Sequence, residues 1–138
     1  MKRVKAKLKN LRISPRKVRL VASLIKGMDV ENALFQLSST VKGSSKSIEK
    51  LLKSAIANAE NNFGLERKNL FVADIQIGEG PILKRWLPRA YGRATQIMKR
   101  TSTVFLTLEE KVEKKIKEEK IEKSENKKIP NKNSDKIK

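Results

Sequence analysis

The sequence contains no cysteine and no histidine. Without cysteine there can be no disulfide bonds or thiolate metal sites, a composition typical of proteins in a reducing compartment. Without histidine or cysteine, the most common general base, the usual zinc ligands and the thiol nucleophile are all missing. Carboxylate or lysine chemistry stays open, but the composition favours a protein that is not an enzyme and that holds no metal or other cofactor.

Long apolar runs and aromatic residues are also scarce. No apolar run approaches the ~20 residues that a membrane-spanning helix needs, and no apolar stretch follows the basic first residues, so we expect neither a membrane partner nor a secretory signal. A cytoplasmic protein is the expectation. Only 4% of the 138 residues are aromatic, so Leu, Ile, Val and Ala must build the core of one small domain.

Acidic residues are also few. The sequence has 15 of them and 33 lysines and arginines, which gives a formal net charge of +18. Between Glu79 and Glu109 there is no acidic residue at all. The same stretch carries six cations: Lys84, Arg85, Arg89, Arg93, Lys99 and Arg100. A surface that carries only positive charge indicates a negatively charged partner. Phosphate-rich nucleic acid is the partner that this charge favours.

Trp86 and Tyr91 lie among these cations. Aromatic rings of this kind stack on unpaired bases, which is more typical of RNA recognition than of duplex DNA recognition. The alternative for Trp86 is packing against Leu87 or against an opposite strand.

A second basic region lies at the start of the chain. In residues 3–11, apolar and cationic residues alternate with a period of two, which predicts a half-buried strand with a cationic outer face. The alternative is an edge strand that lysines protect from aggregation. The cations at issue are Arg3, Lys5, Lys7 and Lys9.

Three helices are expected next. The first begins with Ser14 as N-cap and Pro15 in the first helical position, and it ends at Gly27. Asp29 can cap a short second helix, and the third runs from about 45 to 63 by its apolar stripe. Four cations lie around the start of the first helix, where the helix dipole disfavours positive charge. We therefore expect them to bind phosphate. The alternative is that they form a solvated face. They are Arg12, Arg16, Lys17 and Arg19.

The second half of the domain predicts two more strands. Residues 70–77 are apolar at nearly every position, which indicates a strand covered on part of both faces. The Gly/Pro-rich residues 78–81 predict a bulge or kink, and residues 103–108 alternate as a strand. The basic segment between them predicts a long β-hairpin over about 78–104, with its turn near residue 90 and arms of roughly 30 Å. Such a ribbon has no core of its own, so we expect it to become ordered inside a partner.

The expected fold is therefore α+β: a small antiparallel sheet packed with three helices, plus the protruding hairpin, in residues 1–108. Residues 109–138 form a Lys/Glu-rich tail outside this domain. Its charge spacing predicts a charged helix over Glu110–Lys123, followed by disorder over 126–138.

Several short motifs carry a family resemblance. One run spans the predicted hairpin: Gly80-Pro81, Lys84-Arg85, Pro88-Arg89-Ala90, Gly92-Arg93-Ala94, Ile97 and Lys99-Arg100-Thr101-Ser102. Two sets lie in the first and third helices: Arg12, Ser14-Pro15, Lys17, Arg19 and Gly27, then Leu51-Leu52, Ser54-Ala55, Ala57-Asn58-Ala59 and Asn62. Collinear over about residues 3–108, they resemble the motifs of the universal large-subunit ribosomal protein twenty-two family. Tyr91 departs from the pattern, since the family usually has arginine there, and Thr103 replaces a usual histidine.

The resemblance implies a structural constituent of the large subunit of cytoplasmic ribosomes. It implies binding to large-subunit (23S) rRNA, support of subunit assembly, and a hairpin that lines the nascent-peptide exit tunnel. The implied partners are that rRNA, neighbouring large-subunit proteins and the nascent polypeptide, with no small-molecule substrate. The tip expected to face the tunnel lumen consists of Arg89, Ala90, Tyr91, Gly92 and Arg93. Charge and resemblance together predict as rRNA-binding residues Arg3, Lys5, Lys7, Arg12, Arg16, Lys17, Arg19, Lys84, Arg85, Trp86, Arg89, Arg93, Lys99 and Arg100.

Two other functions are weighed against this one. A nucleoid protein that binds DNA without sequence preference would use the same charge, but no dimer-forming element is evident. A magnesium-dependent nuclease would need converging carboxylates, and Asp74 and Glu79 are the only nearby pair.

Overall fold

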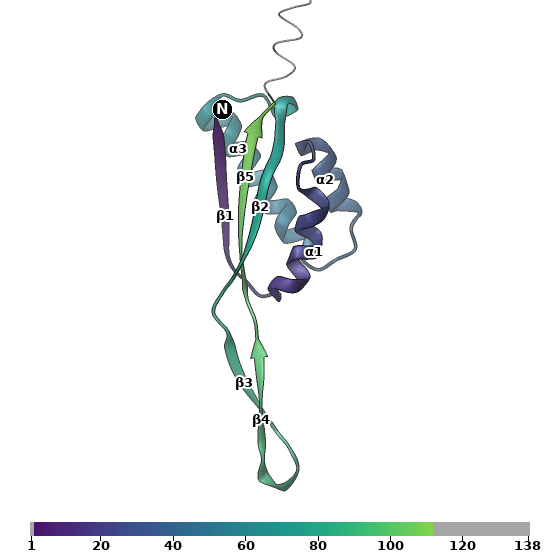
Figure 1. The fold of residues 1–138 in the computed structure, drawn as a ribbon, viewed down its shortest axis with the longest axis vertical. Helices are drawn as coiled ribbons and strands as arrows, with labels where there is room; N and C mark the ends of the chain where they lie inside the picture. The colour runs from purple at the N-terminus through teal and green to yellow at the C-terminus, as the bar shows by residue number, and fades with distance from the viewer. Residues whose placement is uncertain (1, 112–138) are drawn as a thin grey trace, which may run out of the picture.

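The computed structural model describes residues 2–111 and consists of a body and a long arm (Figure 1). In the body, a three-stranded antiparallel sheet of order β1-β5-β2 packs against three helices, which confirms the expected α+β fold. The arm is the two-stranded sheet β3-β4. The strands are β1 (Arg3–Leu11), β2 (Leu70–Glu79), β3 (Leu83–Pro88), β4 (Ala94–Lys99) and β5 (Ser102–Glu110). The helices are α1 (Pro15–Ile25), α2 (Val30–Ser39) and α3 (Ser45–Phe63), with short 3-10 turns η1 (Arg67–Asn69) and η2 (Ala90–Gly92).

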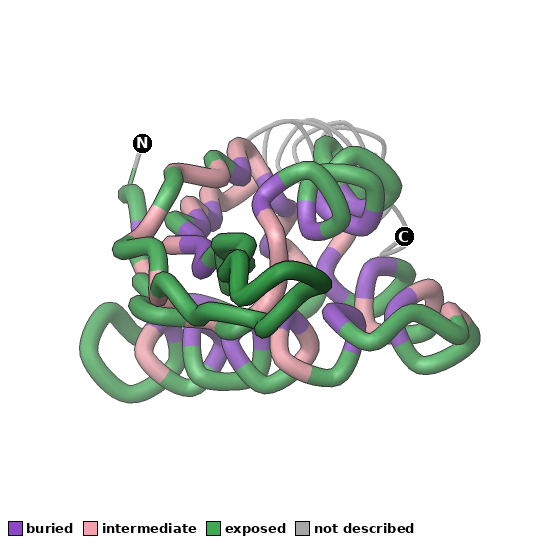
Figure 2. The backbone as a smooth tube through the Cα atoms, turned by 90° about the horizontal axis from the view of Figure 1, so that it is seen from below, coloured by how far each residue is buried: buried purple, intermediate pink, exposed green. Residues whose placement is uncertain are grey.

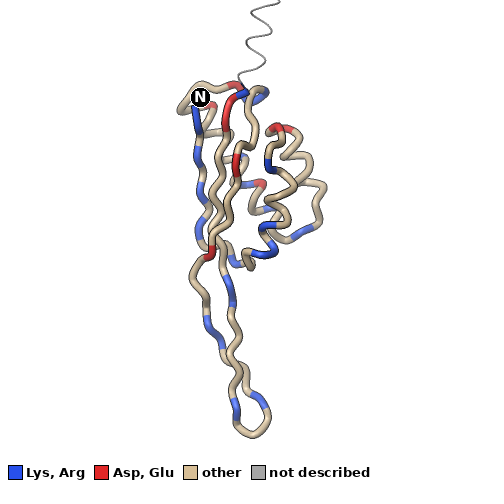
Figure 3. The backbone as a smooth tube through the Cα atoms, in the orientation of Figure 1, with Lys and Arg blue, Asp and Glu red and all other residues tan. Residues whose placement is uncertain are grey.

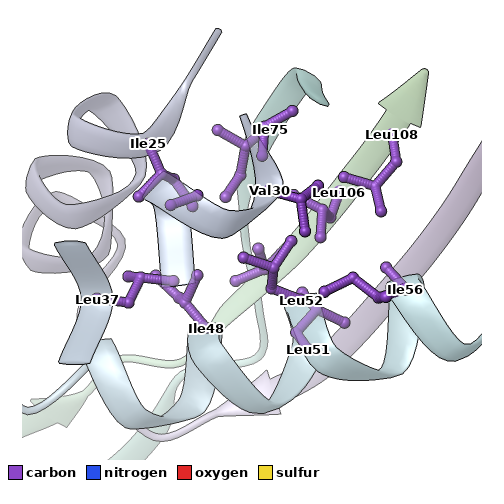
Figure 4. Close-up of a cluster of buried hydrophobic side chains, with 14 of the residues drawn as sticks. Ile25, Val30, Leu37, Ile48, Leu51, Leu52, Ile56, Ile75, Leu106 and Leu108 are labelled. Carbon is purple, nitrogen blue, oxygen red and sulfur yellow. The ribbon is translucent and has the colours of Figure 1, made fainter. Parts of the chain in front are cut away.

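One face of the sheet and the apolar stripes of the helices form a single core (Figure 4). Along β5 the inward side chains of Val104, Leu106 and Leu108 are buried, while Phe105 between them is exposed, as the period-two pattern predicts. Helix α3 crosses this face with a fully buried Leu52. Its remaining buried stripe is Ile48, Leu51, Ala55, Ile56 and Ala59.

The pairing of β2 with β5 contains a register shift at a place that the sequence did not predict. The register shift lies between Val72 and Asp74, whereas Gly78 and Glu79 pair regularly with β5. The ladder does end at Glu79, and between the pairs Glu79–Ser102 and Leu83–Lys99 the three residues 80–82 lie opposite the two residues 100–101, so the break expected at 78–81 is present at its second half. The extra residue at the shift changes the parity of the strand, so that Val72 and Ile75, three positions apart, are both buried.

Helices α1 and α2 begin where the sequence predicts, but their side-chain caps are absent. Ser14 and Asp29 hold the N-cap positions with extended backbones, and neither side chain makes a cap hydrogen bond. The Asp29 carboxylate instead forms an ion pair with Lys111, which follows β5. The position of each helix start was thus predictable, while the bonding of its cap was not.

The link between α1 and α2 attaches to the outer edge of β2. Gly27 adopts a left-handed backbone, φ 79°, and its N–H donates to the carbonyl of Val72 at 2.8 Å. The Val72 N–H in turn donates to the carbonyl of Met28 at 2.9 Å. Because these bonds cover backbone groups of an edge strand, they tie the helical layer to the sheet.

The arm leaves the body at a junction between Gly80 and Thr101. The Gly80 N–H donates to the Thr101 carbonyl at 3.0 Å, and the Thr101 hydroxyl donates to the Pro81 carbonyl at 2.7 Å. From Leu83 onwards the arm extends away from the body. Its residues beyond Leu83 are exposed, and Figure 2, which looks along the arm, shows them in green. The structure therefore confirms a protruding hairpin with its turn near residue 90.

The expected tail falls mostly outside the described residues. Glu110, assigned by its charge spacing to the start of a helix, is the last residue of β5. The rest of that predicted helix, and the predicted disorder over 126–138, lie beyond residue 111. In the described part of the chain, no helix has the length and apolar character needed to cross a membrane.

Candidate nucleic-acid interface

Basic residues follow one another along β1 (Figure 3), and their exposure alternates with the burial of Val4, which places their side chains on the face of the sheet away from the core. Arg3, Lys5 and Lys7 are all exposed, as the alternation predicts. Two of them also have partners within the protein. The Arg3 Nε pairs with Glu109 Oε1 at 2.6 Å, and Lys7 Nζ lies 4.5 Å from the centroid of the Phe105 ring. Lys5 has no such partner among the described residues, so it is the most available of the three.

The basic region around the start of α1 meets the base of the arm through Arg12. Arg12, Arg16, Lys17 and Arg19 are exposed, as expected. A hollow of about 360 Å³ at this junction is lined by Arg12, Ser14, Met98, Lys99, Arg100 and Thr101. The fold thus joins two basic regions that are far apart in the sequence, and three cations from the two segments border one concave surface.

The arm carries cations on both of its faces. In the β3-β4 ladder, Lys84 lies opposite Met98 on one face, while Leu83 lies opposite Lys99 and Arg85 opposite Ile97 on the other. Side chains directly opposite one another in an antiparallel ladder share a face, and successive residues alternate between faces. The basic residues lie along both strands of the arm (Figure 3), and the register places their side chains on both of its faces.

The tip is a tight turn closed by the two flanking arginines. The Arg89 N–H donates to the Arg93 carbonyl at 2.7 Å, and the Arg89 Nε donates to Thr95 Oγ1 at 3.1 Å. Tyr91 and Gly92 both have left-handed backbones, with φ of 58° and 69°. A left-handed conformation is uncommon for a bulky residue, and Tyr91 is 99% exposed. Ala90 is exposed too, so the whole predicted tip is accessible.

Trp86 is 65% exposed on β3. The alternative in which Trp86 packs against its neighbours therefore applies to about a third of its surface. Sequence reasoning missed the residue opposite it, Gln96 on β4. A lone glutamine has neither charge nor an aromatic ring to single it out, and only the register of the ladder places it beside Trp86.

The carboxylates weighed for a nuclease are arranged differently from a metal site. Asp74 Oδ1 lies 2.8 Å from Lys26 Nζ, and Asp74 Oδ2 accepts a hydrogen bond from the Gln76 amide at 2.8 Å. The hydrogen bond from Lys26, followed by that from Gln76, holds the pKa of Asp74 below its usual range. Within residues 2–111, no group of three potential acidic ligands converges on one point. Asp74 is thus engaged in an ion pair with the end of α1.

Comparison with known proteins identifies related sequences. Residues 6–109 match the family model described as ribosomal protein L22p/L17e. The chain is also 55% identical over 108 residues to the large ribosomal subunit protein uL22 of Mycoplasmopsis agalactiae, an alignment covering 78% of this chain and 95% of that protein. The matched region contains the whole arm and most of the body.

Proposed function

This chain belongs to the ribosomal protein L22p/L17e family, and on that premise we propose that it binds large-subunit rRNA and lines the nascent-peptide exit tunnel with its arm. The family is one of ribosomal proteins of the large subunit rather than of enzymes. Its place is the ribosome of the cytoplasm, in agreement with the location expected from the sequence.

One observation carries the proposal of rRNA binding: cations on both faces of a ribbon that has no core. Arg85 and Lys99 lie on one face and Lys84 on the other, and no acidic residue occurs between Glu79 and Glu109. A protein that only rests on the outside of a polyanion needs cations on one face. A ribbon with cations all round is stabilised when phosphates approach from both sides, which is the surrounding that folded RNA provides.

The other basic regions supply the anchoring surface of the body. The hollow between Arg12, Lys99 and Arg100 faces outward at the root of the arm, so RNA bound there contacts body and arm together. The exposed Lys5 of β1 and the cations of the first turns of α1 extend this surface. A protein that holds RNA segments at both body and arm supports assembly of the subunit, because it brings those segments together.

The tip is the part of the arm proposed to meet the tunnel lumen. Its exposed turn, from Arg89 to Arg93, has no packing partner in the body. With Tyr91 fully exposed between two arginines, the tip offers an aromatic ring and positive charge to a nascent polypeptide. Neighbouring large-subunit proteins are the remaining proposed partners, and catalysis and small-molecule substrates have no part in the proposal.

Sedimentation tests this function directly. A cell lysate is separated on a sucrose gradient, and the protein is detected by blotting before and after a high-salt wash. We expect stoichiometric retention on the large subunit after the wash, because peripheral electrostatic binders lose affinity steeply as salt rises. Recovery mainly in the free or DNA-bound fractions would overturn the proposal and favour a nucleoid protein.

A further inference from the structure

Trp86 and Gln96 occupy directly opposite positions in the ladder of the arm. In an antiparallel pair, side chains at opposite positions share a face, with their Cβ atoms about 4.5–5.5 Å apart. The indole and the amide are therefore neighbours in the middle of the arm, on the face that also carries Lys84.

Neither side chain has a partner within the described residues. Both are exposed, and no hydrogen bond involves the indole N–H of Trp86 or the amide of Gln96 in residues 2–111. Water satisfies these groups on a free arm. When a partner encloses the arm and displaces that water, the polar groups need new hydrogen bonds, because an unpaired polar group is costly to bury.

On the face of the arm that carries Trp86 and Gln96, short side chains lie towards the tip and cations lie towards the body. Towards the tip, the next pair on the same face is Pro88 opposite Ala94, and both side chains are short. Towards the body, the next pair is Lys84 opposite Met98, and Arg100 Nη2 approaches the Met98 sulfur at 3.8 Å. The exposed indole therefore lies next to two cationic groups, those of Lys84 and Arg100.

We propose that Trp86 and Gln96 bind one unpaired nucleobase of the rRNA. The indole stacks on the face of the base, the Gln96 amide hydrogen-bonds to its edge, and Lys84 and Arg100 contact the adjoining phosphates. The inference rests on the proposed rRNA binding and specifies the kind of nucleotide that the arm takes. Stacking on aromatic side chains is how proteins hold unpaired bases in RNA.

The amide predicts which base is preferred. It presents a donor and an acceptor side by side, and this pair complements the N6 amino group and the N7 acceptor of adenine. Trp86 alone accepts any base, since every base has a face on which to stack. The preference for adenine therefore depends on Gln96.

Trp86 is the only tryptophan in the chain, so its emission reports on this site alone. The full-length protein is titrated with protein-free 23S rRNA, and then at low salt with oligoadenylate and oligouridylate RNAs of equal length. We expect the indole emission to be quenched as each RNA binds, with tighter binding of oligoadenylate. Binding itself is measured independently by filter retention.

Two substitutions separate stacking from packing. Trp86→Phe keeps an aromatic face and should bind rRNA nearly as the unchanged protein does. Trp86→Leu keeps apolar bulk without a face for stacking, and should bind about 5- to 150-fold more weakly. If Trp86 only packs within the arm, both variants bind alike, and the proposal is overturned.

Gln96→Leu tests the reading of the base. This variant should keep the quenching and lose the preference for oligoadenylate. Lys84→Ala is the matched control on the same face, and it should weaken binding to both oligonucleotides equally. Unchanged emission on saturation with 23S rRNA would overturn this inference and leave rRNA binding intact, whereas a chain that binds no rRNA would overturn the proposed function as well.

Discussion

The hydroxyl of Ser102 donates a hydrogen bond to the carbonyl oxygen of Ile13, a residue 89 positions earlier in the chain. The preceding residue, Thr101, donates its own hydroxyl to Pro81 on the opposite side of the arm, at 2.7 Å. Two consecutive side chains thus join the loop before α1, the central strand β5 and the root of the arm. The relative position of the two basic regions depends on these polar contacts, because the arm itself has no core to hold it.

The Ser102 bond should contribute measurably to the stability of the body. Ser102 is fully buried, so Ser102→Ala leaves the Ile13 carbonyl without that partner. We expect the free energy of unfolding to fall by about 1–3 kcal/mol. Denaturant unfolding followed by far-UV circular dichroism measures this change. Ser47→Ala is the control, since Ser47 is half-buried in α3 without a side-chain hydrogen bond among the described residues, and its substitution should change little.

A side chain at Gly80 should disturb the structure, whereas a side chain at Gly78 should not. A Cβ at Gly80 would meet the Thr101 hydroxyl oxygen closely and lie 3.3 Å from the Thr101 carbonyl carbon. Gly80→Ala therefore displaces the root of the arm, at a cost of about 1–3 kcal/mol for overpacking. We expect weaker binding to 23S rRNA, measured by filter retention.

Gly78→Ala provides a matched control two residues away on β2. A Cβ there has ordinary contacts, the nearest at 3.8 Å from the Phe105 ring, so rRNA affinity should be unchanged. Equal affinity of the Gly80→Ala and Gly78→Ala proteins would show that the junction does not position the arm.

The ion pair between Lys26 and Asp74 should make stability depend on pH in acid solution. Lys26 lowers the pKa of Asp74 in the folded protein, so the pair stabilises the fold above the unfolded-state pKa of about 3.9. That stabilisation is lost as the pH falls through the lowered pKa of the folded state. Lys26→Met should therefore be less stable than the unchanged protein near neutrality and equal to it in strong acid.

An NMR titration of the Asp74 carboxyl measures this shift directly. We expect its midpoint to rise in Lys26→Met. Lys53→Met, which breaks the 2.7 Å pair with Glu49 on α3, should leave the Asp74 midpoint in place. An Asp74 that titrates in the usual range of aspartate in the unchanged protein would contradict the prediction.

Cations of the arm should dominate the salt dependence of RNA binding. The double substitution Arg85→Gln and Lys99→Gln removes two cations that lie on the same face of the β3-β4 ladder. If each contacts a phosphate, the slope of log affinity against log salt should fall in magnitude by about 0.7–0.9 per residue. Filter binding to 23S rRNA at several salt concentrations measures the slope.

Lys46→Gln with Lys50→Gln removes the same charge from α3, away from the arm. Both lysines are exposed, so this pair controls for net charge alone. We expect the slope to change much less than in the arm variant. Identical slopes for the two double variants would mean that the arm binds no phosphate directly.

Local sequence patterns predicted the elements well because their signals are local. The apolar stripe around Leu52 and the left-handed Gly64 define α3, and its observed bounds are those expected. The alternation of Val104 with Phe105 likewise predicted which side of β5 is buried. The long basic segment between two apolar strands predicted the hairpin for the same reason, since it could not bury itself.

Contacts between distant segments were not predictable in this way. The insertion of β5 between β1 and β2, the shift after Val72 and the pairing of Asp29 with Lys111 all depend on how the whole core packs. The pairing of Trp86 with Gln96 depends on the register of the arm, which a single residue of slippage would change.

The sequence by itself determined the α+β elements and the one-signed arm, and it predicted a nucleic-acid partner, because periodicity and charge are properties of the chain alone. Only the tertiary structure decided that Arg12 meets Lys99 and Arg100 around one hollow, and that cations lie on both faces of the arm. These relations arise when long-range strand pairing and burial of the common core bring remote residues to fixed positions, which no local pattern encodes.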